Sequence, residues 1–184
     1  MRKVFISCFF VILVAVSASS QSSTSAYDSV DPFIGTAADG NTFPGATLPF
    51  GMIQWGPDTR QDGWYHYGDK TIRGFSLTHI SGAGCPLYGD VPVLPWSKQI
   101  GESDDPSKFT AGFNHDKEEA HPGYYEVPLD DGTKIELTVA ERAGIARFEF
   151  LTGNPRTLVF NAAGSATIDA PHREKDESTI EIRG

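Results

Sequence analysis

The chain has 184 residues, with 24 acidic side chains against 15 basic ones and a formal charge of −9. This length suffices for one domain with a hydrophobic core, since domains of about 100–150 residues are the commonest. An acidic protein lacks the basic surface that nucleic acids and anionic lipids require, so we expect neither as a partner. Neutral polar ligands such as sugars are compatible with this charge, although the charge does not select them.

Residues 1–20 have the pattern of a secretory signal peptide: two basic residues, an uncharged apolar run of 13 residues over 4–16, and small residues at 17–20. The alternative, a retained membrane anchor, is disfavoured because a spanning helix needs about 20 apolar residues. We therefore expect export to the periplasm or the extracellular space, with no membrane attachment after cleavage. The mature protein would keep 13 basic against 24 acidic residues, a formal charge of −11, and Cys85 as its only cysteine.

The stretch that follows predicts loops and short strands. Residues 21–29 are rich in Ser and Thr and predict a flexible lead-in. Between 31 and 96 the density of Gly, Pro and aromatic residues disfavours helices, and the apolar runs 52–55, 75–80 and 91–94 predict short strands. The polar, charged residues 98–121 predict a solvated surface excursion.

The strongest strand signals lie in the second half of the chain. Residues 124–129 and 134–140 flank Asp130-Asp131-Gly132, and an Asp-Gly pair between such runs predicts a hairpin. Alternating apolar residues indicate a further strand at 146–150, and 158–160 and 179–182 add two more. Successive antiparallel strands predict an all-β antiparallel sandwich, incomplete at its C-terminal end because the sequence stops within a strand pattern.

A series of short motifs occupies residues 30–90. In chain order they are Val30-Asp31-Pro32-Phe33-Ile34-Gly35-Thr36, Gly40-Asn41-Thr42-Phe43-Pro44-Gly45-Ala46, Pro49-Phe50-Gly51-Met52, Pro57-Asp58-Thr59-Arg60, Gly63-Trp64-Tyr65-His66-Tyr67, the run from Gly74 to Cys85, and Tyr88-Gly89-Asp90. This succession resembles the N-terminal domain of glycoside hydrolase family 92, the exo-acting α-mannosidases, over residues 30–184.

The resemblance implies a two-domain enzyme with a β-sandwich in front of an (α/α)6 helical barrel. Such enzymes invert the anomeric centre and depend on calcium, and the acid, the base and most calcium contacts lie in the barrel. This chain would then be the truncated front domain, without the barrel, lining the substrate pocket and docking to the catalytic part. The expected partners are mannose-containing glycans and the missing barrel, and we assign no catalytic residue and no metal ligand within the chain.

The predicted substrate-binding residues are Asp58, Trp64, Gly84, Cys85 and Asp90, with His79 supporting from behind. An inverting glycosidase needs two carboxyl groups roughly 6.5–9.5 Å apart, and nothing in the spacing of the aspartates at 58, 62, 69 and 90 selects a pair. Asp58 and Asp90 could instead hydrogen-bond loop amides. A Trp64 ring in a polar loop suits stacking against a sugar; the alternative is packing against the sandwich.

Other chemistries have weaker support in this region. His79 lies in an alternating run and is expected to be a hydrogen-bonded structural residue, because a Cys–His nucleophile would need a third, orienting group. Cys85 follows a Gly-Ala-Gly turn that could bring backbone close to a ligand, but the turn lacks the G-x-G-x-x-G pattern of a nucleotide loop. The five histidines have no zinc-type spacing.

The sequence therefore predicts the N-terminal part of an exported, calcium-dependent glycosidase that releases α-linked mannose with inversion. The alternatives are a carbohydrate-binding module without catalysis, a purely structural front domain, or a truncated product without function. Two departures from the family pattern leave the mannose linkage open: Tyr65 follows Trp64 directly where many relatives carry an insertion, and Asn41 stands where a His is frequent.

Overall fold

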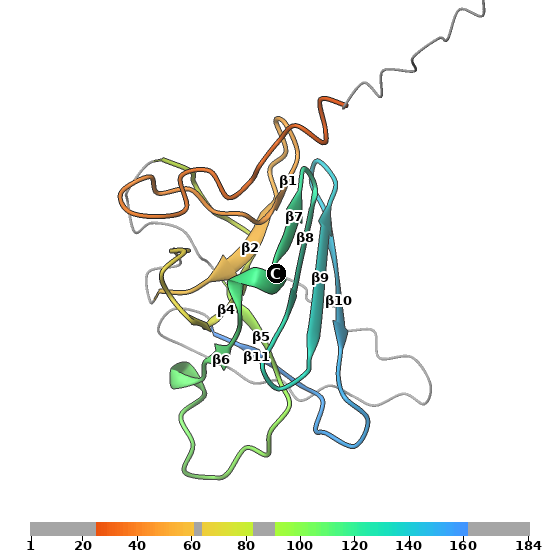
Figure 1. Ribbon diagram of the computed structural model, residues 1–184. Coiled ribbons are helices and arrows are strands. Elements are labelled where there is room, and N and C mark those ends of the chain that lie inside the picture. The colour runs from red at the N-terminus through yellow and green to blue at the C-terminus, as the bar shows by residue number, and fades with distance from the viewer. Residues whose placement is uncertain (1–24, 61–63, 83–90, 162–184) are drawn as a thin grey trace, which may run out of the picture.

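The computed structural model describes residues 25–60, 64–82 and 91–161, and these form short strands joined by long loops (Figure 1). In chain order the elements are β1 (Ala46–Thr47), β2 (Gln54–Asp58), β3 (Thr71–Ile72), β4 (Gly74–Ser76), β5 (Val93–Trp96), the 3-10 helix η1 (Pro106–Lys108), β6 (Ala111–Gly112), the 3-10 helix η2 (His115–Lys117), β7 (Glu119–His121), β8 (Tyr124–Pro128), β9 (Lys134–Val139), β10 (Gly144–Glu149) and β11 (Thr157–Phe160).

Two antiparallel sheets build the domain. One has the strand order β1-β2-β4-β5-β11 and the other β10-β9-β8-β7, while β3 and β6 form a separate pair. Side chains from both sheets meet in one buried cluster, with Trp55, Phe75 and Leu94 on one side and Tyr125 and Leu137 on the other. The predicted all-β antiparallel fold is confirmed, and so is its sandwich character.

The hairpin formed by β8 and β9 follows the sequence closely. Leu129 and Thr133 close its turn, the Leu129 amide donating to the Thr133 carbonyl at 2.8 Å. Gly132 lies in the turn at φ +84°, a conformation that glycine adopts without steric cost. Ile135 and Leu137 are fully buried, because alternate residues of a strand point to the same face.

We predicted that residues 98–121 form a solvated surface excursion, and this prediction was wrong for about half of the segment. Ala111, Phe113 and Ala120 are buried in the core. β6 pairs with β3, and Phe113 forms an isolated bridge with Leu129. Phe109, Ala111 and Phe113 do alternate with Thr110 and Gly112, but this strand-like pattern is only five residues long and lies between highly charged stretches.

The ends of the chain carry predictions that lie partly or wholly outside the described residues. The expected signal peptide at 1–20 and the expected strand at 179–182 are not among them. Residues 25–29 of the expected lead-in form an exposed turn in which the Ser25 hydroxyl donates to Asp28 at 2.8 Å. No helix within the described ranges is long and apolar enough to cross a bilayer.

Candidate functional site

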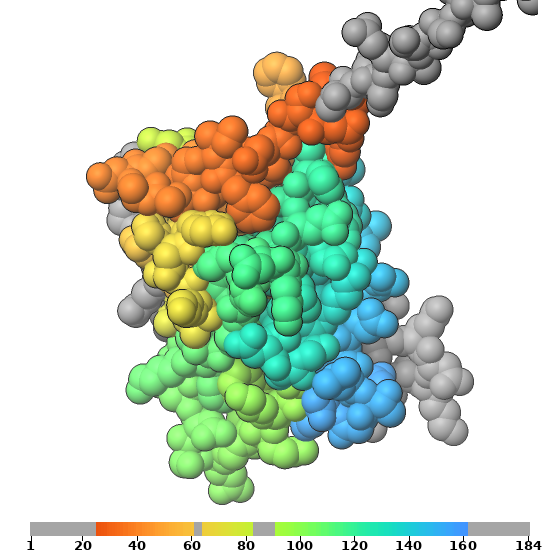
Figure 2. Space-filling model, viewed as in Figure 1, coloured from red at the N-terminus to blue at the C-terminus, as the bar shows by residue number. Residues whose placement is uncertain are grey.

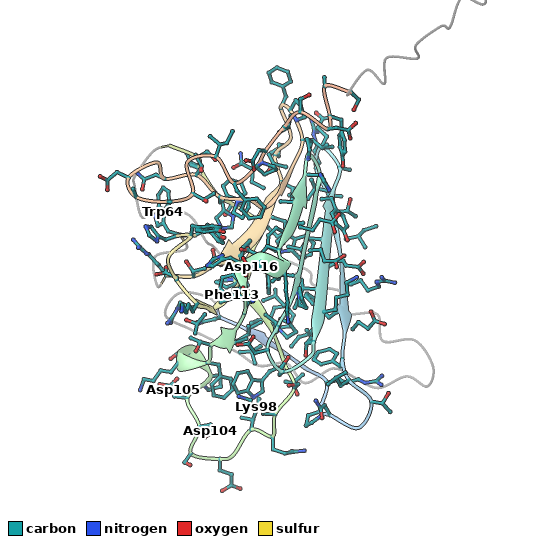
Figure 3. The ribbon with its side chains drawn as sticks, in the orientation of Figure 1. Trp64, Lys98, Asp104, Asp105, Phe113 and Asp116 are labelled. Carbon is teal, nitrogen blue, oxygen red and sulfur yellow. The ribbon has the colours of Figure 1, made fainter. Side chains whose placement is uncertain are left out.

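Three of the motif-bearing loops, around residues 36–41, 64–69 and 77–82, gather on one side of the domain, around the ends of β2 and β4 (Figure 1). The Tyr67 amide donates to the Thr36 carbonyl at 2.9 Å, and the Gly82 amide donates to the Asn41 carbonyl at 2.6 Å. Segments around residues 36–41, 64–69 and 77–82 are therefore neighbours, although up to about 40 positions separate them in the sequence. Figure 3 places Trp64 in this loop cluster.

A buried acid–imidazole pair lies beneath these loops. Asp58, the last residue of β2, contacts His79 Nε2 through Oδ1 at 2.9 Å, and the side chains are 1% and 3% exposed respectively. The other carboxylate oxygen accepts from the Ser76 hydroxyl. His79 Nδ1 lies 2.9 Å from the Gln54 carbonyl, and the Phe43 ring stacks on the imidazole at 4.5 Å.

These contacts fix where the protons of the pair lie. A carbonyl oxygen only accepts, so His79 Nδ1 carries a proton and donates it to Gln54. His79 Nε2 lies against Asp58 Oδ1, so both ring nitrogens and both carboxylate oxygens have partners without contact to water. Ser76 donates to Asp58 rather than to His79, so its hydroxyl is not aligned for activation by the imidazole. The arrangement is a structural anchor under the loops.

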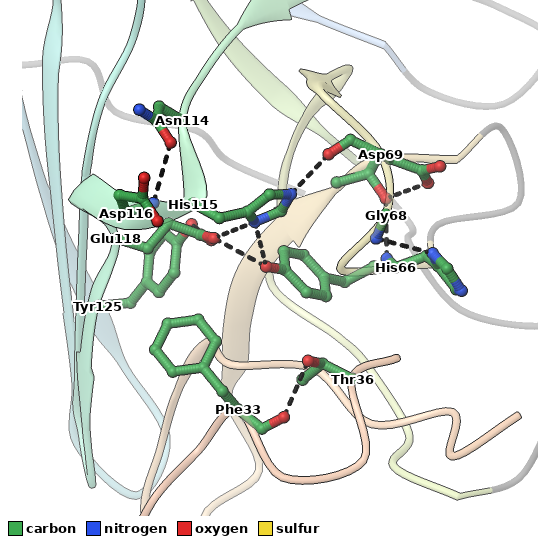
Figure 4. A network of polar contacts seen from close by, with 12 residues as sticks. Phe33, Thr36, His66, Gly68, Asp69, Asn114, His115, Asp116, Glu118 and Tyr125 are labelled. Carbon is green, nitrogen blue, oxygen red and sulfur yellow. Dashed lines mark hydrogen bonds and ion pairs between the residues drawn. The ribbon is translucent and has the colours of Figure 1, made fainter. Parts of the chain in front are cut away.

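A second buried network centres on Glu118, whose side chain is 0% exposed (Figure 4). Its oxygens accept from Tyr65 at 2.8 Å and from Tyr125 at 2.6 Å, and His115 Nδ1 lies 2.5 Å from one of them. His115 Nε2 donates to the Asp69 carbonyl at 2.6 Å. Burial raises the pKa of Tyr65 and of Tyr125 well above the usual value for tyrosine, and the charge of Glu118 raises both further.

The Glu118 network holds the loop that carries Trp64. Tyr65 follows Trp64 directly, and the Trp64 carbonyl accepts from the amides of Thr59 and Arg60 at 2.8 and 2.9 Å. The Trp64 side chain is partly exposed, whereas Tyr65 is buried. Tyr65 therefore points inward to the Glu118 network, and the ring of Trp64 faces the loop cluster.

The network is the part of the site that the sequence did not indicate. His115 and Glu118 stand in the segment expected to be solvated, and their tyrosine partner at position 65 is about 50 residues away. A His and a Glu three positions apart in a polar segment usually mark a solvated surface, so no local signal could have identified them.

The predicted site residues divide into three groups. Asp58 and His79 are brought into direct contact, and Trp64 lies in the same loop cluster. Gly84, Cys85 and Asp90 lie outside the described residues. The part of the chain that the structure describes contains no group of three or more His, Cys, Asp or Glu side chains arranged to hold a metal ion.

Residues 29–184 match the family model described as the glycosyl hydrolase family 92 N-terminal domain, which places this sandwich among the glycoside hydrolases. The chain belongs to glycoside hydrolase family 92. A curated relative, named as an uncharacterized secreted glycosidase of Arthroderma benhamiae, is 37% identical over 138 residues, which cover 68% of this chain and 17% of the relative.

Solved structures of the family have the same fold. A family 92 α-mannosidase from Bacteroides thetaiotaomicron superposes with a TM-score of 0.66 at 40% identity, covering 73% of this chain and 20% of that one. A structure of that α-mannosidase with mannoimidazole gives a TM-score of 0.66 at 39% identity, covering 73% of this chain and 19% of that one. The chain thus spans about a fifth of the length of these relatives.

Proposed function

We propose that this chain is the N-terminal part of an exported glycoside hydrolase that releases α-linked mannose from glycans by an inverting, calcium-dependent mechanism. The observation that carries the proposal is the match, at 40% identity and a TM-score of 0.66, to a solved α-mannosidase. A relative named as secreted and the predicted signal peptide support export. In the longer enzyme this part lines the substrate pocket and docks to a helical catalytic barrel.

Within this chain, the proposed pocket wall consists of Trp64, Gly84, Cys85 and Asp90, with Asp58 at its base. The Trp64 ring offers a flat apolar face on which the C–H face of a sugar ring can stack. Asp58 stands at the end of β2 with His79 behind it, so the buried pair fixes the base of the wall. The wall orients the sugar and excludes water; it transfers no proton.

The paired carboxyl groups of an inverting mechanism are proposed to lie elsewhere in the longer enzyme. One such group must protonate the leaving oxygen and the other must activate a water molecule. Asp58 and Glu118 are the buried carboxylates of the described site, and both are engaged in hydrogen bonds within the protein. The calcium ion, which would polarise sugar hydroxyls and favour a distorted ring, is likewise proposed to bind mainly outside this chain.

The experiment that tests the role of Trp64 is the Trp64→Ala variant of the longer enzyme. A stacked ring contributes about 0.5–1.5 kcal/mol, so we expect kcat/KM on an aryl α-mannoside to fall by up to roughly tenfold with a nearly unchanged melting temperature. The matched control is Trp55→Ala: Trp55 is buried and donates its indole N–H to the Phe75 carbonyl at 3.2 Å. This control should lose about 3–5 kcal/mol of stability.

Two outcomes would contradict this assignment. A large fall in melting temperature for Trp64→Ala, with kcat/KM per folded molecule preserved, would place the ring in the core rather than in the pocket. Binding of mannosides by the longer protein without any hydrolysis would instead indicate a carbohydrate-binding module.

A further inference from the structure

The turn between β1 and β2 holds a phenylalanine in an unfavourable conformation. The Gly51 amide donates to the Leu48 carbonyl at 2.9 Å, which closes a four-residue turn with Pro49 and Phe50 at its centre. Phe50 has φ +61°. Proline followed by a residue with positive φ is the pattern of a type II turn, whose third position normally carries Gly or Asn. A side chain with a Cβ atom is strained there.

The same phenylalanine is fully exposed. Its relative exposure is 100%, and Met52, two residues on, is 67% exposed. Figure 2 shows the turn protruding from one end of the molecule. The chain therefore bears two costs at this turn, backbone strain and an apolar ring in water, and gains no contact in return within the described residues.

The turn is nevertheless held firmly in place. The Met52 amide donates to the Glu141 carbonyl at 2.7 Å, and the Gly123 amide donates to the Thr47 carbonyl at 2.8 Å. These bonds fasten the turn to the two hairpin turns of the neighbouring sheet. An apolar projection that is fixed in direction is suited to insertion into a preformed cavity, because little conformational entropy is lost on docking.

We propose that the turn, with Phe50 and Met52 at its tip, inserts into an apolar cavity on the remainder of the longer enzyme. The inference rests on the proposed function, in which this chain is the front part of such an enzyme. Relatives of known structure have about four fifths of their length outside the matched region, so a large partner surface exists within the same polypeptide. Residues 48–53 carry no charge, so the cavity that receives them is apolar.

The exposure of Met52 to oxidation tests this proposal directly. Methionine oxidation by hydrogen peroxide follows solvent exposure. In the folded longer enzyme we expect Met52 to oxidise about tenfold more slowly than in a synthetic peptide of residues 46–57, as measured by mass spectrometry of the proteolytic fragment. Phe50→Asn removes the ring but suits the positive φ. It should restore fast oxidation, whereas Phe50→Leu should keep most of the protection.

A matched control is Ile145→Thr, which changes another strongly exposed apolar side chain, on β10. It should leave Met52 protected and the melting temperature of the longer enzyme unchanged, whereas Phe50→Asn should lower that temperature. Equal oxidation rates for Met52 in the enzyme and in the peptide would overturn the proposal. So would protection that depends on protein concentration, which would indicate a second copy as the occupant.

The result of the Met52 oxidation experiment can be told apart from the result of a test of the proposed mannosidase activity. A longer protein that protects Met52 but hydrolyses no mannoside would retain this inference and refute the activity. A protein that hydrolyses α-mannosides while Met52 oxidises freely would retain the activity and refute the docking of the turn.

Discussion

At position 58 a carboxylate with 1% exposure is held by one hydroxyl and one imidazole, and the imidazole is held in turn by a backbone carbonyl. Each of these groups has a hydrogen-bond partner for its donor or acceptor atoms. Such a buried hydrogen-bond network is stable only while all of its members are present, because a charge left alone in the interior has neither water nor a partner.

We predict that Asp58→Asn lowers the free energy of unfolding by about 3–5 kcal/mol, the range measured when one partner of a buried ion pair is removed. The amide offers one accepting oxygen where the carboxylate offers two, so either Ser76 or His79 would face an NH₂ group in place of its acceptor. The measurement is urea unfolding followed by tryptophan fluorescence. Asp28→Asn, an exposed aspartate in the turn at residues 25–29, is the control and should change stability by less than about 0.5 kcal/mol.

The sequence placed Asp58 and His79 among the site residues but gave no indication that they touch. They are 21 residues apart, and the bond between them depends on the pairing of β2 with β4, which sets Asp58 opposite Gly74. Pairing of this kind is set by the tertiary fold, so a residue-by-residue analysis finds the two groups but not the contact. Their roles toward a sugar stay predictions.

At the scale of elements, the Glu118 network joins the loop before β3 to η2 and β8. Tyr65 comes from the loop, His115 from η2 and Tyr125 from β8, and all three contact the same carboxylate. Because these elements are far apart in the sequence, the network acts as a clamp between the loop cluster and the four-stranded sheet.

The clamp predicts a loss of stability at alkaline pH. In the unfolded chain a tyrosine ionises near pH 10, whereas burial and then the charge of Glu118 raise the pKa of Tyr65 and Tyr125 in the folded state. A folded-state pKa above the unfolded one means that the contribution to stability is fully present below pH 10 and is lost as the pH rises above it. Each tyrosine should remove about 1.4 kcal/mol per pH unit in that range.

Urea unfolding between pH 8 and pH 11 measures this slope. Tyr65→Phe should be less stable than the parent at pH 8, because Glu118 loses a donor, but its stability should fall less steeply above pH 10. The double variant with Tyr125→Phe should be flatter still. A slope that is the same in all three proteins would show that these tyrosines do not carry the alkaline transition.

The strands differed in how well the sequence located them. β8 and β9 were predicted to within one residue at each end, because one of their faces is buried and the other is not, which produces a clear alternation; β10 begins at Gly144, two residues before the predicted start. β2 covers Gln54–Asp58, whereas the apolar run at 52–55 had predicted an earlier strand. It is buried along most of its length. A strand covered on both faces shows no alternation, and here it also includes Gly and Pro.

At the scale of the whole molecule, the described part is a front domain with its loop cluster on one side and an apolar turn projecting from one end. The matched part of this chain covers 20% and 19% of the length of the two relatives of known structure. The fold class could be predicted from strand patterns and the family from motif order. The strained, exposed ring of Phe50 could not, since Pro49-Phe50-Gly51-Met52 in a sequence suggests an ordinary turn and says nothing about whether its ring is covered.

The last prediction concerns the chain by itself: incubated with an aryl α-mannoside and calcium, it should give no turnover above the buffer rate. Hydrolysis with inversion needs two carboxyl groups roughly 6.5–9.5 Å apart with water between them, and the carboxylates of the described site, Asp58 and Glu118, are buried and hydrogen-bonded within the protein. Near-ultraviolet circular dichroism should first establish that the chain is folded, and the longer enzyme serves as the positive control. Turnover by the chain that disappears in an Asp58→Asn or Asp90→Asn variant would contradict the prediction and place catalytic groups in this domain.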